Sequence, residues 1–193
     1  MNSTRQTRRS DTRQRIQDVA LELFAEQGYE KTSLREIAER LDVTKAALYY
    51  HFRTKEDILT GLVEDLTRPM EELVAWAREQ PPTLETRREV LRRYSEALRG
   101  AGPLFRFLQE NQAALRELSI GEGIKKRLMV MGDLMVPEKA SLTDRMRCVS
   151  ALFTMHMGMH GMRHVDATPE EKRLAALEVA IELVERAHAG DRT

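Results

Sequence analysis

The sequence predicts an all-α protein, with a compact three-helix unit at the amino terminus and a larger helical domain after it. Apolar residues recur at intervals of three and four along most of the chain, which is the spacing of one face of an α-helix. Turn-forming residues separate segments of helix length, and the alternating β-branched runs typical of strands are absent. We expect a flexible basic arm at 1–12, a helix-turn-helix unit at 13–54 and a helical body at 55–193.

Composition is typical of a soluble helical protein, with 41% hydrophobic and 32% charged residues. No apolar run approaches the roughly 18 to 20 residues of a membrane span, and the arginine-rich amino terminus lacks the apolar core of a signal peptide. The single cysteine excludes an internal disulfide framework. We therefore expect a cytoplasmic protein with no membrane partner.

Positive charge is concentrated at the amino end, although the formal net charge of the chain is +0. The total argues against a general nucleic-acid coat protein, which would be strongly basic. One acid, Asp11, accompanies five arginines there, namely Arg5, Arg8, Arg9, Arg13 and Arg15. Such an arm is expected to be disordered alone and to follow a phosphate backbone or enter a minor groove when DNA is present.

The first helix of the amino-terminal unit carries an apolar stripe and ends at Gly28. The members of the stripe, spaced at i, i+3, i+4, i+7 and i+8, are Ile16, Val19, Ala20, Leu23 and Phe24. Tyr29 and Leu34 are placed to close a small core. This helix is expected to support the motif that follows it.

Residues 33–55, SLREIAERLDVTKAALYYHFRTK, have the pattern of a helix-turn-helix. Ser33 and Glu36 form a capping box at the start of its first helix. The apolar face of that helix consists of Leu34, Ile37, Ala38 and Leu41. The pattern breaks at 41–43, and Thr44 is placed to cap a second helix.

One face of the second helix of the motif is expected to pack into the core, and the other face is expected to contact a partner. Leu48 and Phe52, four residues apart, are expected to face inward. The residues left mostly outward are Lys45, Ala46, Tyr49 and Tyr50. Tyrosine rings and hydroxyls can contact phosphates and base edges, and Lys45 and Thr44 can add phosphate contacts. The alternative is that the two tyrosines pack on neighbouring helices.

From about Arg13 to Leu59 the sequence resembles the tetracycline-repressor (TetR/AcrR) family of bacterial transcription regulators. The family pattern is a small residue, one variable residue, Leu-Tyr-x-His-Phe and then x-x-Lys-x-x-Leu. It is met by Ala46, Leu48, Tyr49, His51, Phe52, Lys55 and Ile58. There are two mild departures, Ala46 where glycine is frequent and Thr44 where serine is frequent.

The resemblance implies a homodimer that binds an operator with inverted repeats and a carboxy-terminal domain that binds a small effector. DNA contacts would come from Thr44, Lys45, Ala46, Tyr49, Tyr50 and His51. Thr32 or Ser33 would hold one phosphate at the start of the preceding helix, and Lys55 another. We therefore predict a ligand-responsive dimeric transcriptional regulator that acts as a repressor, with activator behaviour left open.

Proline, glycine and threonine residues divide the second domain into helical segments. A linking helix begins at Thr54, carries Ile58, Leu62 and Leu66, and is expected to reach Pro69. The later segments are expected at 69–79, 84–99, 103–119, 122–135, 141–164 and 168–188. The linking helix joins the two domains, so a tilt of it would move the helix-turn-helix.

Two sets of residues in this domain are assigned on the resemblance. An effector pocket, expected to take a small apolar molecule, would be lined by Trp76, Tyr94, Phe105, Phe107, Leu108, Met129, Met131, Met155 and Met159, each of which is also a plausible core residue. A dimer interface between the last two helices and their symmetry mates would use Val149, Leu152, Phe153, His156, His160, Leu174, Leu177, Ile181 and Val184. These stripes can alternatively be buried within their own chain.

The segment Met155 to His164, MHMGMHGMRH, leaves a metal-responsive regulator open as an alternative. His156, His160 and His164 are spaced at i, i+4 and i+8, with Cys148 upstream. Each four-residue step turns about 40° around a helix, so the four cannot share one site within a chain. We therefore expect no metal and no cofactor. A remote alternative, an enzyme with a fused DNA-binding head, lacks any catalytic motif.

Overall fold

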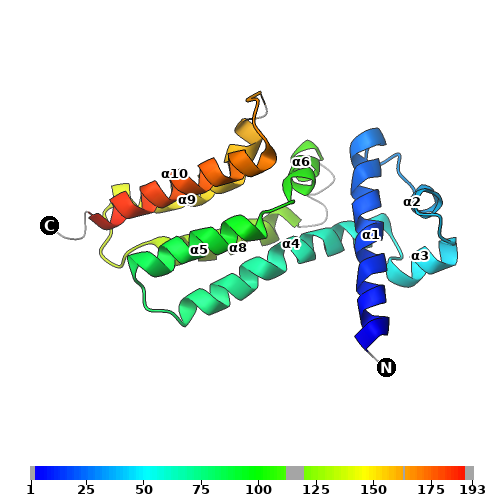
Figure 1. Ribbon diagram of the computed structural model, residues 1–193, viewed down its shortest axis with the longest axis horizontal. Helices are drawn as coiled ribbons and strands as arrows, with labels where there is room; N and C mark the ends of the chain where they lie inside the picture. Colours follow the sequence, from blue (N-terminus) through cyan, green and yellow to red (C-terminus); the bar gives the residue numbers. More distant parts are fainter. Residues whose placement is uncertain (1–2, 112–119, 163, 190–193) are drawn as a thin grey trace. The chain divides into compact units, whose positions relative to one another are not determined.

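The computed structural model describes residues 3–111, 120–162 and 164–189, and every regular element in these ranges is an α-helix. The helices, drawn in Figure 1, are α1 (Ser3–Gln27), α2 (Leu34–Arg40), α3 (Lys45–His51), α4 (Lys55–Arg78), α5 (Leu84–Ala97), α6 (Gly102–Glu110), α8 (Ile120–Met135), α9 (Leu142–Gly161) and α10 (Pro169–Ala189). The all-α prediction is confirmed. Within the described residues, no helix combines the length and the apolar character needed to cross a membrane.

The chain forms two compact units. The first consists of Met1–Asp65 with Pro103–Ile120, and the second of Leu66–Gly102 with Gly121–Thr193. Helix α4 contributes to both. The first unit therefore contains the predicted helix-turn-helix together with α6, a helix that begins 47 residues after the start of α4.

Helix α1 begins at Ser3, so residues 3–12 continue the first helix instead of forming the flexible arm that the sequence suggested. Residues 3–12 contain neither glycine nor proline, the residues that most often interrupt a helix. The first helix can therefore extend through this segment toward the amino terminus. The arginines that the arm would carry thus belong to a helical segment.

Helix α4 is continuous from Lys55 to Arg78, although two helices meeting at Pro69 were expected. Proline inside a helix removes one hydrogen bond and costs about 3 kcal/mol. Leu66, Met70, Leu73 and Ala77 form one buried stripe that runs past the proline on both sides. Burying each of the larger side chains contributes about 1.5–3 kcal/mol, which outweighs the loss.

An aromatic cluster joins α6 to α1 within the first unit. The Phe107 ring stacks on Phe24 with centroids 5.3 Å apart, and lies 5.9 Å from the ring of Tyr29. Phe24 and Tyr29 meet edge to face at 5.0 Å. Phe107, which the sequence placed among the effector-pocket residues, is thus a core residue of the unit that carries the helix-turn-helix. This corrects its assignment.

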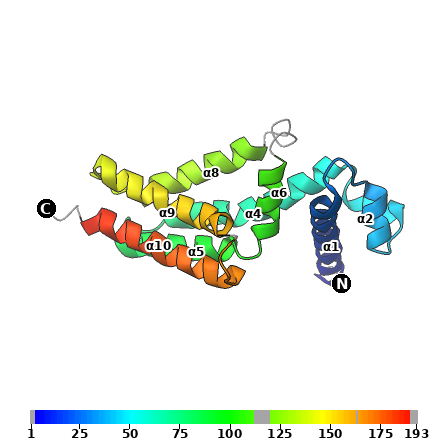
Figure 2. The same ribbon diagram turned by 90° about the horizontal axis from the view of Figure 1, so that it is seen from above.

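In the second unit, α10 packs along α9 and against α5, as Figure 2 shows. Polar groups between α5 and α10 are paired. The Arg173 guanidinium of α10 is buried and donates to the hydroxyl of Ser95 on α5 at 2.5 Å, while Glu170 of its own helix accepts a second bond at 2.7 Å. Arg88 on α5 donates to Glu185 on α10 at 2.6 Å. These bonds fix the register of the two helices.

Candidate nucleic-acid interface

The first helix of the motif, α2, begins at the predicted capping box. The backbone N–H of Ser33 donates to the Glu36 carboxylate at 2.7 Å, and the Glu36 N–H donates to the Ser33 hydroxyl oxygen at 3.2 Å. Hydrogen bonds from Ser33 lower the pKa of Glu36, so this carboxylate stays charged near neutral pH. Ile37 and Ala38 on the opposite side of the helix are buried.

The turn after α2 has a backbone that normally selects glycine. The N–H of Val43 donates to the Ala38 carbonyl at 3.0 Å and that of Asp42 to the Glu39 carbonyl at 3.2 Å, which together form a Schellman motif. Asp42 has a φ of 54°, in the left-handed region. This turn aims the chain into α3.

We expect Asp42→Gly to raise the free energy of unfolding by about 0.5–1 kcal/mol, because glycine removes the left-handed strain at some entropic cost. Asp42→Ala is the matched control, since it removes the carboxylate but keeps a Cβ at the strained position. Chemical denaturation measures both. A glycine variant no more stable than the alanine variant would contradict a left-handed Asp42.

Helix α3 is held against the unit by its inner face. Leu48 and Phe52 are buried as predicted, and Thr44 caps the helix by accepting the Ala47 N–H at 3.2 Å. The guanidinium of Arg13 on α1 lies over the Phe52 ring, 4.4 Å from its centroid. A Cβ at Gly61 on α4 would lie 2.7 Å from the same guanidinium, so glycine allows α4 to approach here. Sequence reasoning did not assign Arg13 or Gly61 to this packing.

The outer face of α3 presents the four residues that the sequence left outward. Tyr49 is 41% exposed and Tyr50 65% exposed, and Lys45 and Ala46 are exposed as well. The Lys45 ammonium lies 5.4 Å from the centroid of the Tyr49 ring. The ring of His51, which is half-buried, meets Tyr50 edge to face at 5.3 Å. The tyrosines therefore do not fill the core, the alternative that the sequence had left open.

Thr32 is buried, which corrects its assignment as a phosphate contact. Its hydroxyl donates to the carbonyl of Gly28 at 2.9 Å and lies 3.3 Å from that of Leu23. A hydroxyl has one proton to donate, and here that proton ties the loop to the end of α1. Ser33 is exposed, but it donates its hydroxyl to Glu36 at 2.7 Å and would have to release that bond to hold a phosphate.

Lys55 is half-buried and anchors the start of α4 to the loop after α1. Its ammonium donates to the carbonyls of Tyr29 at 2.6 Å and Glu30 at 3.3 Å, and lies 4.5 Å from the centroid of the Tyr29 ring. Burial raises the pKa of Tyr29, whose hydroxyl donates to Glu56 at 3.0 Å. Lys55 therefore has a structural role that the sequence did not indicate.

The remaining predicted pocket residues do not share one environment and come from both units. Tyr94, Met131 and Met155 are buried, and the Tyr94 hydroxyl lies 3.1 Å from Nδ1 of His156. Trp76 is half-buried beneath the guanidinium of Arg93, whereas Met129 is exposed. Phe105 is buried and Leu108 half-buried on α6, while the side chain of Met159 lies outside the described residues.

The predicted dimer residues divide into buried and exposed groups. Leu152 and Val184 are buried within their own chain, which corrects their assignment. Val149, Phe153 and Leu174 are exposed. His156, Leu177 and Ile181 are half-buried, and the side chain of His160 lies outside the described residues. Leu142 and Met146, which the sequence analysis did not include, are exposed on the same face of α9 as Val149 and Phe153, at spacings of four, three and four.

Residues considered as metal ligands are not gathered into a site in the described part of the chain, where no cluster of three or more His, Cys, Asp or Glu side chains could hold an ion. Cys148 is buried and its thiol donates to the Met135 carbonyl at 3.2 Å. Burial raises the pKa of this thiol. His164 is exposed beyond the end of α9.

Comparison with known proteins places the motif in a family. Residues 16–62 match the model of the bacterial regulatory proteins of the tetR family. The HTH-type transcriptional regulator AcrR of Shigella flexneri is 50% identical over 54 residues, 28% of this chain and 25% of AcrR. The HTH-type transcriptional repressor KstR2 of Rhodococcus jostii (strain RHA1) is 37% identical over 81 residues, 40% of each chain. The chain therefore matches less than half the length of these two relatives.

Solved structures share the fold over most of the chain. A transcriptional regulator from Aquifex aeolicus VF5 superposes with a TM-score of 0.62 at 24% identity, covering 86% of this chain and 96% of that one. A TetR-like transcriptional regulator from Rhodococcus sp. RHA1 also gives 0.62, at 18% identity, covering 92% and 95%. The motif match and the shared fold agree: residues 16–62 are similar to the helix-turn-helix of the tetR-family bacterial regulatory proteins, and the chain has the fold of these solved structures.

Proposed function

We propose that this chain is a ligand-responsive dimeric repressor that binds a palindromic operator in the major groove and is released by a small effector. Residues 13–54 would be the DNA-binding domain, and 55–193 would bind the effector and dimerise. The protein would act in the cytoplasm, where the bacterial chromosome lies. No catalytic step is part of this proposal.

The exposed face of α3 is the observation that carries the proposal. Two adjacent tyrosines and a lysine lie on the outside of a helix whose inner face is anchored by Leu48 and Phe52. Exposed aromatic area is unfavourable in water, but it can contact base edges and sugars in a groove. The Thr44 oxygen accepts the capping bond, so its hydroxyl proton can be donated to a phosphate. Ser33 and Lys55 would each add a phosphate contact.

Dimerisation is proposed through the exposed apolar stripe of α9, formed by Leu142, Met146, Val149 and Phe153, and through the exposed Leu174 of α10, the helix that packs along α9. An apolar patch of this kind on a helix pair is typical of a protein interface. Two recognition helices spaced by roughly one turn of DNA, about 34–36 Å, would then read an inverted repeat. The effector would favour a state in which that spacing is lost. The largest shift it can cause in the equilibrium between the two states is set by the difference between its affinities for them.

We expect Phe153→Glu to convert the dimer to a monomer at micromolar concentration, because each association would bury two unpaired carboxylates. Sedimentation equilibrium measures the change in mass. Thr143→Glu is the matched control, since Thr143 is exposed on another face of the same helix and should leave the dimer intact. A Phe153→Glu protein that sediments like the unmodified one would place the interface elsewhere.

Selection of bound fragments from sheared genomic DNA tests the function. The purified protein, at low ionic strength, should enrich fragments that share an inverted repeat with half-sites about one helical turn apart. Recovery of fragments that share no repeat, in an amount that depends only on the salt concentration, would contradict a sequence-specific regulator.

A further inference from the structure

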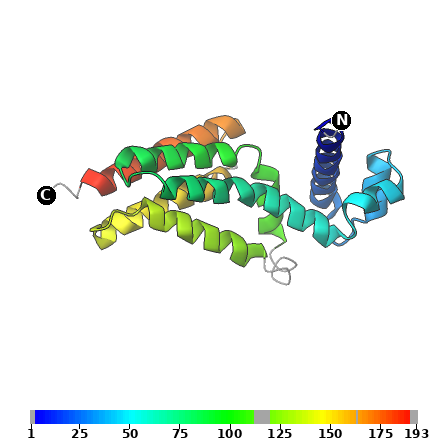
Figure 3. The ribbon, with the colours of Figure 1, turned by 90° about the horizontal axis from the view of Figure 1, so that it is seen from below.

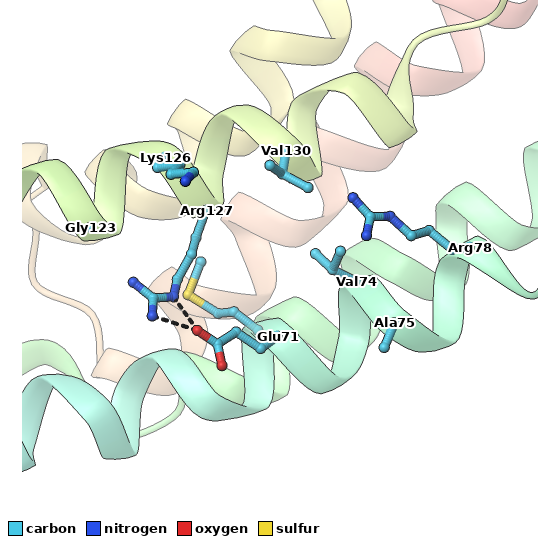
Figure 4. Close-up of a pocket in the computed structure, with 9 residues that line it drawn as sticks. Glu71, Val74, Ala75, Arg78, Gly123, Lys126, Arg127 and Val130 are labelled. Atoms are coloured by element: carbon cyan, nitrogen blue, oxygen red, sulfur yellow. Dashed lines mark hydrogen bonds and ion pairs between the residues drawn. The ribbon is translucent and has the colours of Figure 1, made fainter.

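A pocket of about 520 Å³ lies within the second unit between α4 and α8, two helices that run alongside each other there (Figure 3). Its volume is in the range of small-molecule sites. The lining, shown in Figure 4, consists of Met70, Glu71, Val74, Ala75 and Arg78 from α4 and Gly123, Lys126, Arg127 and Val130 from α8. None of the pocket residues predicted from the sequence is among them.

The sequence explains why a space remains between these helices. The lining residues recur at intervals of three and four on each helix, so that one face of α4 meets one face of α8. Ala75 and Gly123 bring little or no side chain to the space. Met70 is buried, and Val74 and Val130 are half-buried, which gives the middle of the pocket an apolar lining.

The charges around this apolar lining are unbalanced. Three cations, those of Arg78, Lys126 and Arg127, accompany the single carboxylate of Glu71. Arg127 donates its Nε–H to Glu71 at 2.6 Å, so this carboxylate is already matched. In the described part of the chain, neither Arg78 nor Lys126 has an ion-pair partner. The pocket therefore carries surplus positive charge beside an apolar wall.

We propose that this pocket binds an amphipathic anion, an apolar chain that ends in a carboxylate or a phosphate. The chain would lie along Met70, Val74 and Val130, and the anionic end would meet Arg78. Figure 4 shows the Arg78 side chain reaching from α4 toward α8 beside Val130, whereas Arg127 is turned to Glu71. This inference rests on the proposed function and names the effector class, which differs from the purely apolar effector expected from the sequence by its charged end.

Titration calorimetry on the full chain without DNA tests the proposal with four probes of equal chain length. These are decanoate, decyl phosphate, decanol and decylammonium, each below the concentration at which it self-associates. At least one anion should bind about tenfold more tightly than decanol, because a charge-assisted hydrogen bond increases affinity by about that factor. The stronger of the two anions identifies the head group. Equal binding of decanol and both anions would overturn the proposal, as would tighter binding of decylammonium.

Variants of the lining make the test specific to this pocket. Arg78→Gln should weaken the preferred anion about tenfold, and Glu71→Gln should tighten it severalfold because Arg127 is then released toward the ligand. A gain of affinity cannot come from a protein that fails to fold. Lys125→Gln, which removes a charge next to the pocket but outside its lining, is the matched control and should bind as the unmodified chain does. An Arg78→Gln titration equal to that of the unmodified chain would overturn the proposal.

Failure of this inference is separable from failure of the proposed function. The titration contains no DNA, so anion binding is measured whether or not an operator is recognised. Protein that selects an inverted repeat but shows no preference for anions would remain a regulator with another effector. Protein that binds the anions but selects no repeat would retain the pocket and lose the function.

Discussion

Tyr49→Ala and Lys45→Ala are each expected to lower operator affinity at least about 30-fold. A base or phosphate contact in a groove is worth about 1–3 kcal/mol, and a dimer presents each side chain twice. Both side chains lie on the outer face of α3, where Lys45 sits 5.4 Å from the Tyr49 ring, so neither change removes packing from the core. Fluorescence anisotropy with the selected operator measures the affinities.

The two variants should differ in their dependence on salt. Lys45→Ala removes a cation and should reduce the slope of log affinity against log salt by about two for the dimer, whereas Tyr49→Ala should leave it unchanged. Circular dichroism and sedimentation should match the unmodified protein for both. Arg35→Ala, an exposed change on α2 and outside the outer face of α3, is the control. Operator affinity within twofold of the unmodified protein for both α3 variants would remove α3 as the reading helix.

Phe107→Ala should lower the free energy of unfolding of the first unit by about 3–5 kcal/mol. The ring stacks on Phe24 and lies beside Tyr29, and its removal leaves a cavity between α6 and α1. A loss of that size is a large part of the 5–15 kcal/mol that usually stabilises a domain. Urea denaturation followed by circular dichroism measures it.

Arg106→Ala is the matched control for this prediction, since Arg106 is exposed on the same helix next to Phe107. Its effect should stay within about 0.5 kcal/mol. A Phe107→Ala protein that loses less than about 1 kcal/mol would mean that α6 does not contribute to the core of the first unit.

Local signals in the sequence predicted the helix-turn-helix well because they act over three or four residues. The Ser33–Glu36 capping box and the inward spacing of Leu48 and Phe52 both appear as predicted. Thr32 was misassigned because its hydroxyl donates to the Gly28 carbonyl, close to the carbonyl of Leu23, at the end of the preceding helix, which no pattern in a single helix reveals.

Contacts distant in sequence were harder to predict. Phe107 was assigned to an effector pocket, since nothing in residues 103–110 indicates that α6 packs on α1. Pro69 was expected to end a helix, but the burial that keeps α4 continuous depends on its neighbours in the fold. The apolar stripes of α9 and α10 were recognised, yet Leu152 and Phe153 are adjacent residues with opposite exposure, and periodicity alone did not separate the two faces.

Nitration of the four tyrosines, followed by mass spectrometry, tests most directly whether the outer face of α3 meets DNA. Tyr29 and Tyr94 are buried and serve as internal controls, whereas Tyr49 and Tyr50 are exposed. In the free protein, Tyr49 and Tyr50 should be modified while Tyr29 and Tyr94 stay intact. Saturating operator DNA should protect Tyr49 and Tyr50. Equal modification of those two residues with and without bound operator would contradict a role for this face of α3 in reading the duplex.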